Sequence, residues 1–400
     1  MPKEQRLTSR MNNRLVPLAA AFALLAVLAA IYTGLWFLAA DTAKQAVRSW
    51  ADQQRAQGYQ VYWSDMQTTG FPARVVLTVS DPQLRFPADQ GGGGWAAPVL
   101  RVMVEPWKPR TLVFTAPGEH VTNFVANRRV FATRTNAGSG VLTLVVSRDG
   151  QVEEGSLALR SVRVDGLADT GPLELASLDL ALIRNPGGRA SIFERKEASD
   201  TGIWAALDGT LRDLRLPRGL GLPFGDTIDE ATLRSVIPRQ IPPGSDIRSR
   251  LRQWSEAGGV MEVERLTLVA RPLSLGAVGT VALDDWLQPQ AAFSAQLRGF
   301  FEALDQLERA GTIRSRDASI AKVVLGAMAK QPPDGGPLAL ELPVSVQERM
   351  LYLGPVALMQ LPPLRWGGDA PPGRGEIKPG FEIGREGEVT PTPPKITAPK

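Results

Sequence analysis

A long stretch without charged residues dominates the hydrophobic pattern at the start of the chain. Residues 15–40 read LVPLAAAFALLAVLAAIYTGLWFLAA and contain no Asp, Glu, Lys or Arg. About 20 apolar residues suffice to cross the hydrocarbon core of a bilayer. The stretch is preceded by the basic residues Lys3, Arg6, Arg10 and Arg14, and such an excess is typical of the cytoplasmic side. We therefore predict a cytoplasmic N-terminus over 1–14 and a transmembrane anchor over 15–40.

A cleaved signal peptide is the alternative interpretation of this stretch. Signal peptides usually have an apolar core of about 7–15 residues, followed by a small-x-small cleavage site. The stretch here is longer, and Leu38 stands two residues before Ala40, where a small residue is expected. The sequence thus favours a retained anchor in a bacterial inner membrane, with the remainder of the chain in the periplasm.

An amphipathic pattern follows the apolar stretch over residues 41–57. Ala43, Val47, Trp50 and Gln54 fall on one face of a helix, and Gly58 ends the pattern. Two arrangements are open for this helix. It lies on the membrane surface, or it packs on the domain that follows.

From residue 58 the apolar positions recur with a period of two, which predicts half-buried β-strands. The alternating sets are Val75, Leu77 and Val79; Leu100, Val102 and Val104; Leu142, Leu144 and Val146; and Leu338, Leu340, Leu342, Val344 and Val346. Gly and Pro bound these runs. We predict a periplasmic β-rich domain over 58–364.

A short pattern, G-x-[LV]-x-L, recurs six times within this domain. Its copies are Gly140–Leu144, Gly155–Leu159, Gly171–Leu175, Gly279–Leu283, Gly336–Leu340 and Gly354–Leu358. We interpret each glycine as a turn that leads into a strand with two branched side chains on one face. The spacing is typical of a strand-turn-strand meander.

Two helical insertions, at about 226–257 and 299–330, interrupt the predicted strands. Thr227 and Glu230 form a possible capping box for the first, and Phe301, Leu304 and Leu307 make an apolar stripe in the second. The predicted fold class is therefore mainly β with helical insertions (α+β): a single N-terminal transmembrane helix and an elongated antiparallel sheet body. Residues 365–400, with seven Gly and seven Pro, are predicted to be a disordered tail.

Composition excludes several kinds of chemistry. The chain has no cysteine and a single histidine, His120, so disulfides, thiolate sites and zinc sites with several histidines are ruled out. A serine hydrolase triad would have to use His120, and no G-x-S-x-G motif is present. The net charge of +4 is too small to indicate a nucleic-acid partner. We predict a protein that is not an enzyme, with no catalytic residues, metal or cofactor.

Other conspicuous residues have structural explanations that we favour over functional ones. Gly91–Gly94 lacks the Lys-Ser or Lys-Thr of a phosphate-binding loop, and the acidic pairs Asp284-Asp285 and Glu153-Glu154 are expected to be turn or solvated residues. Nine tryptophans could line an apolar ligand groove or serve as core residues and turn anchors; we favour the second.

Four stretches together resemble a known family. They are Tyr62-Trp63 with Gly70-Phe71-Pro72-Ala73-Arg74; Trp95-Ala96-Ala97-Pro98 with Pro106-Trp107-Lys108-Pro109; Gly258-Gly259 through Gly279-Thr280-Val281-Ala282-Leu283-Asp284 to Leu287-Gln288-Pro289; and Leu353-Gly354-Pro355-Val356 with Leu361-Pro362-Pro363-Leu364. The chain resembles a proteobacterial family of single-pass envelope proteins of unknown function. It has a more distant likeness to the AsmA-like envelope proteins, which form long curved sheets with an apolar interior.

The distant likeness implies a role in the movement of lipids. We expect a membrane-anchored periplasmic protein that binds or guides a lipid or another apolar envelope molecule along a β-lined groove. The alternative is a structural or assembly scaffold for envelope proteins that has no small-molecule ligand. The expected partners are membrane lipids, with envelope proteins as a further option, and no nucleic acid.

Overall fold

The computed structural model describes most of the chain. The described residues are 9–87, 92–126, 129–167, 171–185, 203–217, 225–244, 246–309, 311, 313–331, 336–354, 356–361, 363 and 364. The predicted tail over 365–400 lies outside them, as do residues 1–8.

Helix α1 (Ser9–Ala56) is continuous across the predicted anchor and the predicted amphipathic helix. It is long and apolar enough to cross a membrane, a criterion that a signal sequence also meets. The side chains of residues 20–31 are all exposed. The helix thus fits the single transmembrane helix that the sequence predicts.

The first part of the sheet consists of strands that are interrupted midway. Their segments are β1 (Gln60–Tyr62), β2 (Asp65–Thr69), β3 (Val75–Ser80), β4 (Gln83–Arg85), β5 (Gly94–Ala96), β6 (Val99–Glu105), β7 (Lys108–Thr115) and β8 (Glu119–Ala126). β2 pairs with β3, β3 with β6, and β6 with β7. Alongside them, β1 pairs with β4, β4 with β5, and β5 with β8. Each interrupted pair of segments therefore acts as one long strand.

Prolines lie at three of these interruptions, which neighbour one another in the sheet. Asp81-Pro82, Ala97-Pro98 and Pro117-Gly118 occupy them, and the Asp81 amide donates to the Pro98 carbonyl at 2.9 Å. Proline has no amide hydrogen for the ladder, so it is tolerated where a strand breaks. The aligned interruptions bend several strands at the same level.

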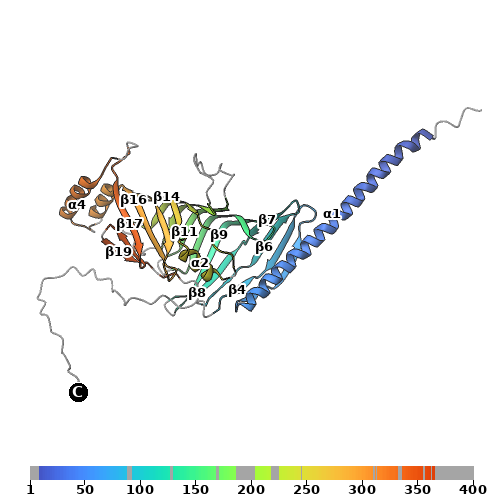
Figure 1. Ribbon diagram of the computed structural model, residues 1–400, viewed down its shortest axis with the longest axis horizontal. Coiled ribbons are helices and arrows are strands. Elements are labelled where there is room, and N and C mark those ends of the chain that lie inside the picture. Colours follow the sequence, from blue (N-terminus) through green and yellow to red (C-terminus); the bar gives the residue numbers. More distant parts are fainter. Residues whose placement is uncertain are drawn as a thin grey trace, which may run out of the picture. The chain divides into compact units, whose positions relative to one another are not determined.

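The remaining strands are uninterrupted and follow one another in chain order. They are β9 (Arg129–Val146), β10 (Val152–Asp165), β11 (Leu173–Arg184), β12 (Ala205–Arg215), β13 (Thr227–Ile237), β14 (Met261–Ala270), β15 (Leu273–Leu283), β16 (Pro289–Arg298), β17 (Leu340–Gln347), β18 (Met350–Leu353) and β19 (Val356–Gln360). β9 pairs with both β7 and β8, and from β9 onward each strand pairs antiparallel with the next. The colours in Figure 1 change steadily across the sheet because it is a meander.

The predicted fold class is confirmed: the protein is mainly β, the sheet is antiparallel and open, and helices are inserted between strands. The second predicted insertion is also confirmed, because α3 (Phe300–Arg309) and α4 (Ser315–Met328) lie within 299–330.

The first predicted insertion is only partly helical. α2 (Ile247–Glu256) begins after Asp246, whose carboxylate accepts hydrogen bonds from the amides of Arg248 and Ser249. Thr227 and Glu230 do not start a helix, because they lie in strand β13. Pairing of β13 with both β12 and β14 outweighs the local capping signal.

The recurrent glycines also differ from our interpretation. Gly171, Gly336 and Gly354 lie outside strands, as expected of turn residues, whereas Gly140, Gly155 and Gly279 lie inside β9, β10 and β15. The latter three therefore do not serve as turns. What they share is an atom of a neighbouring strand close to the position that a Cβ would occupy.

Candidate functional site

One face of the sheet carries an uninterrupted row of apolar residues across twelve successively paired strands. Directly paired residues of an antiparallel sheet point to the same face, so the register identifies the row. It consists of Leu77, Val102, Phe114, Leu142, Leu157, Leu180, Gly209, Leu233, Leu266, Ala277, Ala295 and Leu342. At about 4.8 Å between strands, the row extends for about 50 Å along the sheet.

Two parallel rows widen this apolar surface. The first runs through Val75, Val104, Leu112, Leu144, Gly155, Leu182, Leu207, Ser235, Val263, Gly279, Phe293 and Val344. The second runs through Leu159, Leu178, Leu211, Ala231, Leu268, Leu275, Leu297 and Leu340. We call the three rows together the apolar face.

The opposite side of the sheet is more polar from β10 to β17, although it also includes the exposed side chains of Val141 and Val278. One of its rows contains Ala158, Asp179, Thr210, Thr232, Thr267, Gly276, Gln296 and Glu341. Cross-strand ion pairs reinforce it: Arg160 lies 2.6 Å from Asp179, and Arg234 lies 3.2 Å from Asp208. The sheet is therefore amphipathic, and its polar side is the one suited to water.

The apolar face is covered at its two ends, and Ser235 and Val263 are also buried within it; from β9 to β12 its side chains are partly exposed. At one end Val75 is buried with Trp36 and Ala40 of α1. At the other end Leu340 is buried, and α3 contacts β15. Among the described residues, strands β9 to β13 make extensive contacts only with the strands they pair with. Their apolar side chains, such as Leu142 and Leu157, remain half-exposed, and Leu180 is 37% exposed.

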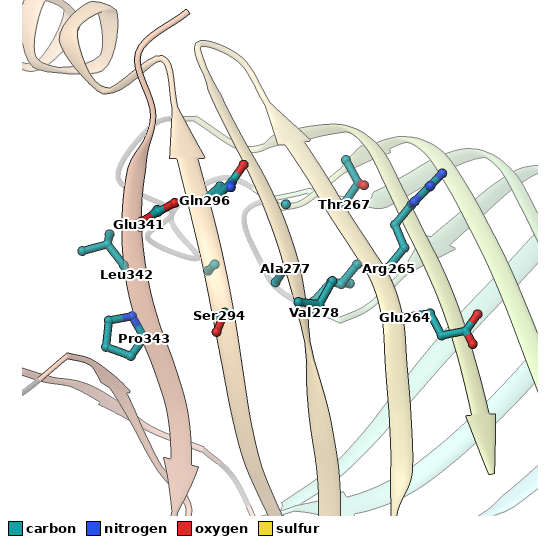
Figure 2. Close-up of a pocket in the computed structure, with 13 residues that line it drawn as sticks. Glu264, Arg265, Thr267, Ala277, Val278, Ser294, Gln296, Glu341, Leu342 and Pro343 are labelled. Carbon is teal, nitrogen blue, oxygen red and sulfur yellow. The ribbon is translucent and has the colours of Figure 1, made fainter. Parts of the chain in front are cut away.

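A hollow of about 800 Å³ lies across β14 to β17, and Leu266, Ala277, Ala295 and Leu342 of the central apolar row are among its lining residues. Figure 2 shows polar side chains around it, among them Arg265, Thr267, Gln296 and Glu341. These positions belong to the polar side of the sheet. Within the described part of the chain, no group of three or more His, Asp or Glu side chains is placed to hold a metal ion. The hollow thus has a mixed lining of polar and apolar residues.

The residues singled out in the sequence serve as structural contacts. His120 accepts a hydrogen bond from Trp95 through Nδ1 at 3.3 Å, and its Nε2 lies 2.7 Å from the Ala116 carbonyl. Asp284 accepts hydrogen bonds from the amides of Trp286 and Gln288 in the β15–β16 turn. Gly92 and Gly93 of the glycine run have positive φ angles, and Gly91 is outside the described residues.

Several tryptophans are anchors, as favoured above. Trp36 donates to the Arg74 carbonyl at 3.1 Å, and Trp254 donates to the Arg239 carbonyl at 3.0 Å. The Arg55 guanidinium lies 5.3 Å from the centre of the Trp63 ring. Trp366 lies outside the described residues.

The strongest electrostatic features are ion pairs away from the apolar face. Lys322 of α4 bonds to Asp305 of α3, which lowers the pKa of the Asp305 carboxyl and raises the pKa of the Lys322 amine. Arg271 likewise lowers the pKa of Asp229. These groups hold neighbouring elements together, and their arrangement contains no acid–base pair directed at a cleft.

The fold and the site together define a class of protein: an open, amphipathic antiparallel sheet preceded by one long apolar helix. Residues 36–362 match the family described as "Uncharacterized protein conserved in bacteria (DUF2125)", and the chain belongs to this family. No curated protein and no solved structure matches the chain significantly. The likeness to AsmA-like proteins stays a prediction.

Proposed function

We propose that the protein binds a lipid or another apolar envelope molecule along the apolar face and guides it across the strands. The observation that carries this proposal is the continuous register of apolar residues from Leu77 to Leu342, of which the central part is uncovered by described elements. Binding without covalent chemistry needs no catalytic group.

The length of the apolar face favours a path along which apolar chains move, and not a pocket that holds a single small ligand. One leaflet of a bilayer core is about 15 Å thick, half of the full ~30 Å core. The apolar row is about three times that length at ~4.8 Å per strand. Each methylene group that moves from water onto such a surface contributes about 0.8 kcal/mol. Because the residues of the row are all apolar, none of them binds an acyl chain much more strongly than its neighbours. An acyl chain can therefore move along the row.

The proposed location is the bacterial inner membrane, with α1 as a single-pass anchor and the sheet in the periplasm. The exposed apolar side chains of residues 20–31 support insertion into lipid. The family match begins at Trp36, inside α1, and Trp36 is buried against the sheet. A cleavage after this helix segment would remove that contact.

Photo-crosslinking in cells tests the proposal with two adjacent positions of strand β10. A photoreactive amino acid at Leu157 faces the apolar side, and one at Ser156 faces the polar side. We expect lipid adducts, identified by mass spectrometry, at position 157 and far fewer at 156. Equal lipid labelling at both positions, or none at 157, contradicts the proposal.

A scaffold is the second candidate, because α4 presents an exposed apolar stripe. The stripe consists of Ile320, Val323, Val324 and Met328, each at least half exposed. Such a stripe is typical of a helix that packs on another protein. Crosslinking from Val323 distinguishes the candidates: stoichiometric protein adducts there, with no lipid at 157, favour the scaffold.

A further inference from the structure

The second half of α1 lies along the first long strand of the sheet. Near its C-terminal end, the Arg55 guanidinium donates to the Val61 carbonyl at 2.7 Å. Further toward the N-terminus, the Trp36 indole donates to the Arg74 carbonyl at 3.1 Å, and the Tyr32 hydroxyl donates to the Pro72 carbonyl. The strand segments β1 and β2 therefore return the chain along the helix, toward the apolar stretch from which it came.

Because β1 and β2 run back along α1, the β2–β3 turn lies beside Tyr32, Trp36 and Phe37 of the helix. If the membrane span starts at Leu15, directly after the last charge, about 20 residues take it to Gly34. Tyr32 and Trp36 flank this level, and both hold the Gly70–Arg74 turn. Phe71 in the turn also contacts the rings of Trp36 and Phe37, with centroids 5.4 and 6.4 Å apart. For a span of this length, the turn would lie at the boundary between hydrocarbon and water.

A second turn lies beside the first. β3 pairs with β6 through Val75 and Val104, so the β2–β3 turn and the β6–β7 turn emerge at the same end of neighbouring strands. Phe71 is 51% exposed in one turn, and Trp107 is 61% exposed in the other. Two turn tips therefore present aromatic side chains outward at the same edge of the sheet.

Basic residues surround these aromatic side chains. Arg74, Lys108 and Arg110 are exposed. The acidic Glu105 lies 3.9 Å from the Lys108 amine and accepts a hydrogen bond from the Trp107 indole at 3.0 Å. Aromatic rings with nearby cations are the combination favoured at the headgroup level of a membrane, where anionic lipids attract the cations. The patch lies beside Tyr32, Trp36 and Phe37, in the C-terminal part of the apolar stretch over 15–40, and a membrane surface accounts for this position.

We propose that the Gly70–Arg74 and Pro106–Trp107 turns contact the headgroup region of the leaflet from which α1 emerges. Val75 and Val104, which follow and precede these turns, are the first residues of the apolar face. The contact would therefore place the beginning of that face at the lipid surface. The inference rests on the proposed membrane anchoring, and it sets the end of the apolar face that α1 covers at the membrane.

Spin labels on the full-length chain in nanodiscs of phosphatidylethanolamine and phosphatidylglycerol test this contact. The natural absence of cysteine allows single sites, made as Trp107→Cys, Trp286→Cys and Leu25→Cys. Trp286 is the matched control, because it is 52% exposed in the β15–β16 turn. We expect the ratio of oxygen to nickel accessibility at 107 to exceed that at 286 severalfold.

The outcomes separate the contact from the anchoring. A label at 25 that is shielded in lipid, together with labels at 107 and 286 that are equally open to nickel, overturns the contact alone. A label at 25 that is open to nickel overturns the anchoring as well. A label at 107 that is shielded from nickel without a gain in oxygen indicates a protein contact and also overturns the inference. Lipid crosslinking at Leu157 reports on the apolar face independently.

Discussion

The glycines within the strands make room for leucines of neighbouring strands. A Cβ atom on Gly209 would lie 3.0 Å from a methyl group of Leu180, and one on Gly140 would lie 3.2 Å from a methyl group of Leu159. A missing side chain on one strand thus accommodates a large one on the next. This explains why a glycine–leucine pattern recurs inside strands, where no turn is needed.

Two glycines of β15 provide a matched test of this packing. A Cβ on Gly279 would lie 2.1 Å from the Ala292 carbonyl oxygen, whereas a Cβ on Gly276 has no atom within 4 Å. We expect Gly279→Ala to lower the free energy of unfolding by about 1–3 kcal/mol, the usual cost of overpacking. Gly276→Ala should be neutral or slightly stabilising, because alanine restricts the unfolded chain. Thermal unfolding followed by circular dichroism measures both, and equal effects would contradict this explanation.

Trp36 is the residue on which the junction between helix and sheet depends most. It is 5% exposed, whereas its neighbour Phe37 is 61% exposed. We expect Trp36→Ala to destabilise the protein by about 3–5 kcal/mol, as for other large buried aromatics, and Phe37→Ala to have little effect in detergent. Denaturant unfolding compares the two variants. Similar losses would show that Trp36 packs no more tightly than its neighbour.

At the scale of elements, alternation predicted many strands correctly but said nothing of their register. Val75, Leu77 and Val79 predicted β3, and Leu142 and Leu144 predicted part of β9. The apolar face arises only when each strand is aligned with the next, and that alignment depends on pairings between residues distant in sequence. The site was therefore predicted as an apolar β-lined groove, without its residues.

Strand β13 shows why local signals failed elsewhere. Thr227 and Glu230 have the spacing of a capping box, yet Glu230 pairs with both Arg212 and Val269 in the flanking strands. Similarly, Phe71 and Trp107 are 36 positions apart in the sequence, and only the pairing of β3 with β6 brings their turns together. Neither fact can be derived from a local window of sequence.

The contact between α3 and α4 depends on pH because it includes ion pairs between one lysine and two carboxylates. Lys322 bonds to Asp305 and lies 3.6 Å from Glu308. Asp305 has a lowered pKa, so the stability that its ion pair adds is present above the ordinary pKa of such a carboxyl, near 4. This stability is lost as the pH falls through the lowered pKa. Lys322 has a raised pKa, so its contribution is lost only as the pH rises through a value above about 10.4.

We therefore expect α4 to be held most firmly between about pH 5 and 9. A spin label at Ala327→Cys measures this, since its mobility should rise on acidification below pH ~4. The same label combined with Lys322→Gln should be more mobile at neutral pH and respond less to acid. An unchanged response in the Lys322 variant would assign the pH effect to other groups.

At the scale of the whole molecule, each long strand pairs with the strands directly before and after it in the chain. Stability in such an arrangement is close to a sum of neighbour interactions, as in repeat proteins. We expect mechanical pulling on the C-terminus, with α1 held in a bilayer, to release the sheet in several steps that start at β18 and β19. A single abrupt transition would show that the sheet unfolds as one unit.

The meander also has a consequence for how the protein is made. In the proposed periplasmic location, a strand emerging from a secretion channel would find its first partner already outside, because that partner was synthesised immediately before it. Each connection joins strands that are consecutive in the chain, so pairing does not wait for distant segments. At each moment one unpaired edge is exposed, and the next strand covers it. The order of the strands thus limits the time during which an apolar sheet edge is open to aggregation before the chain is complete.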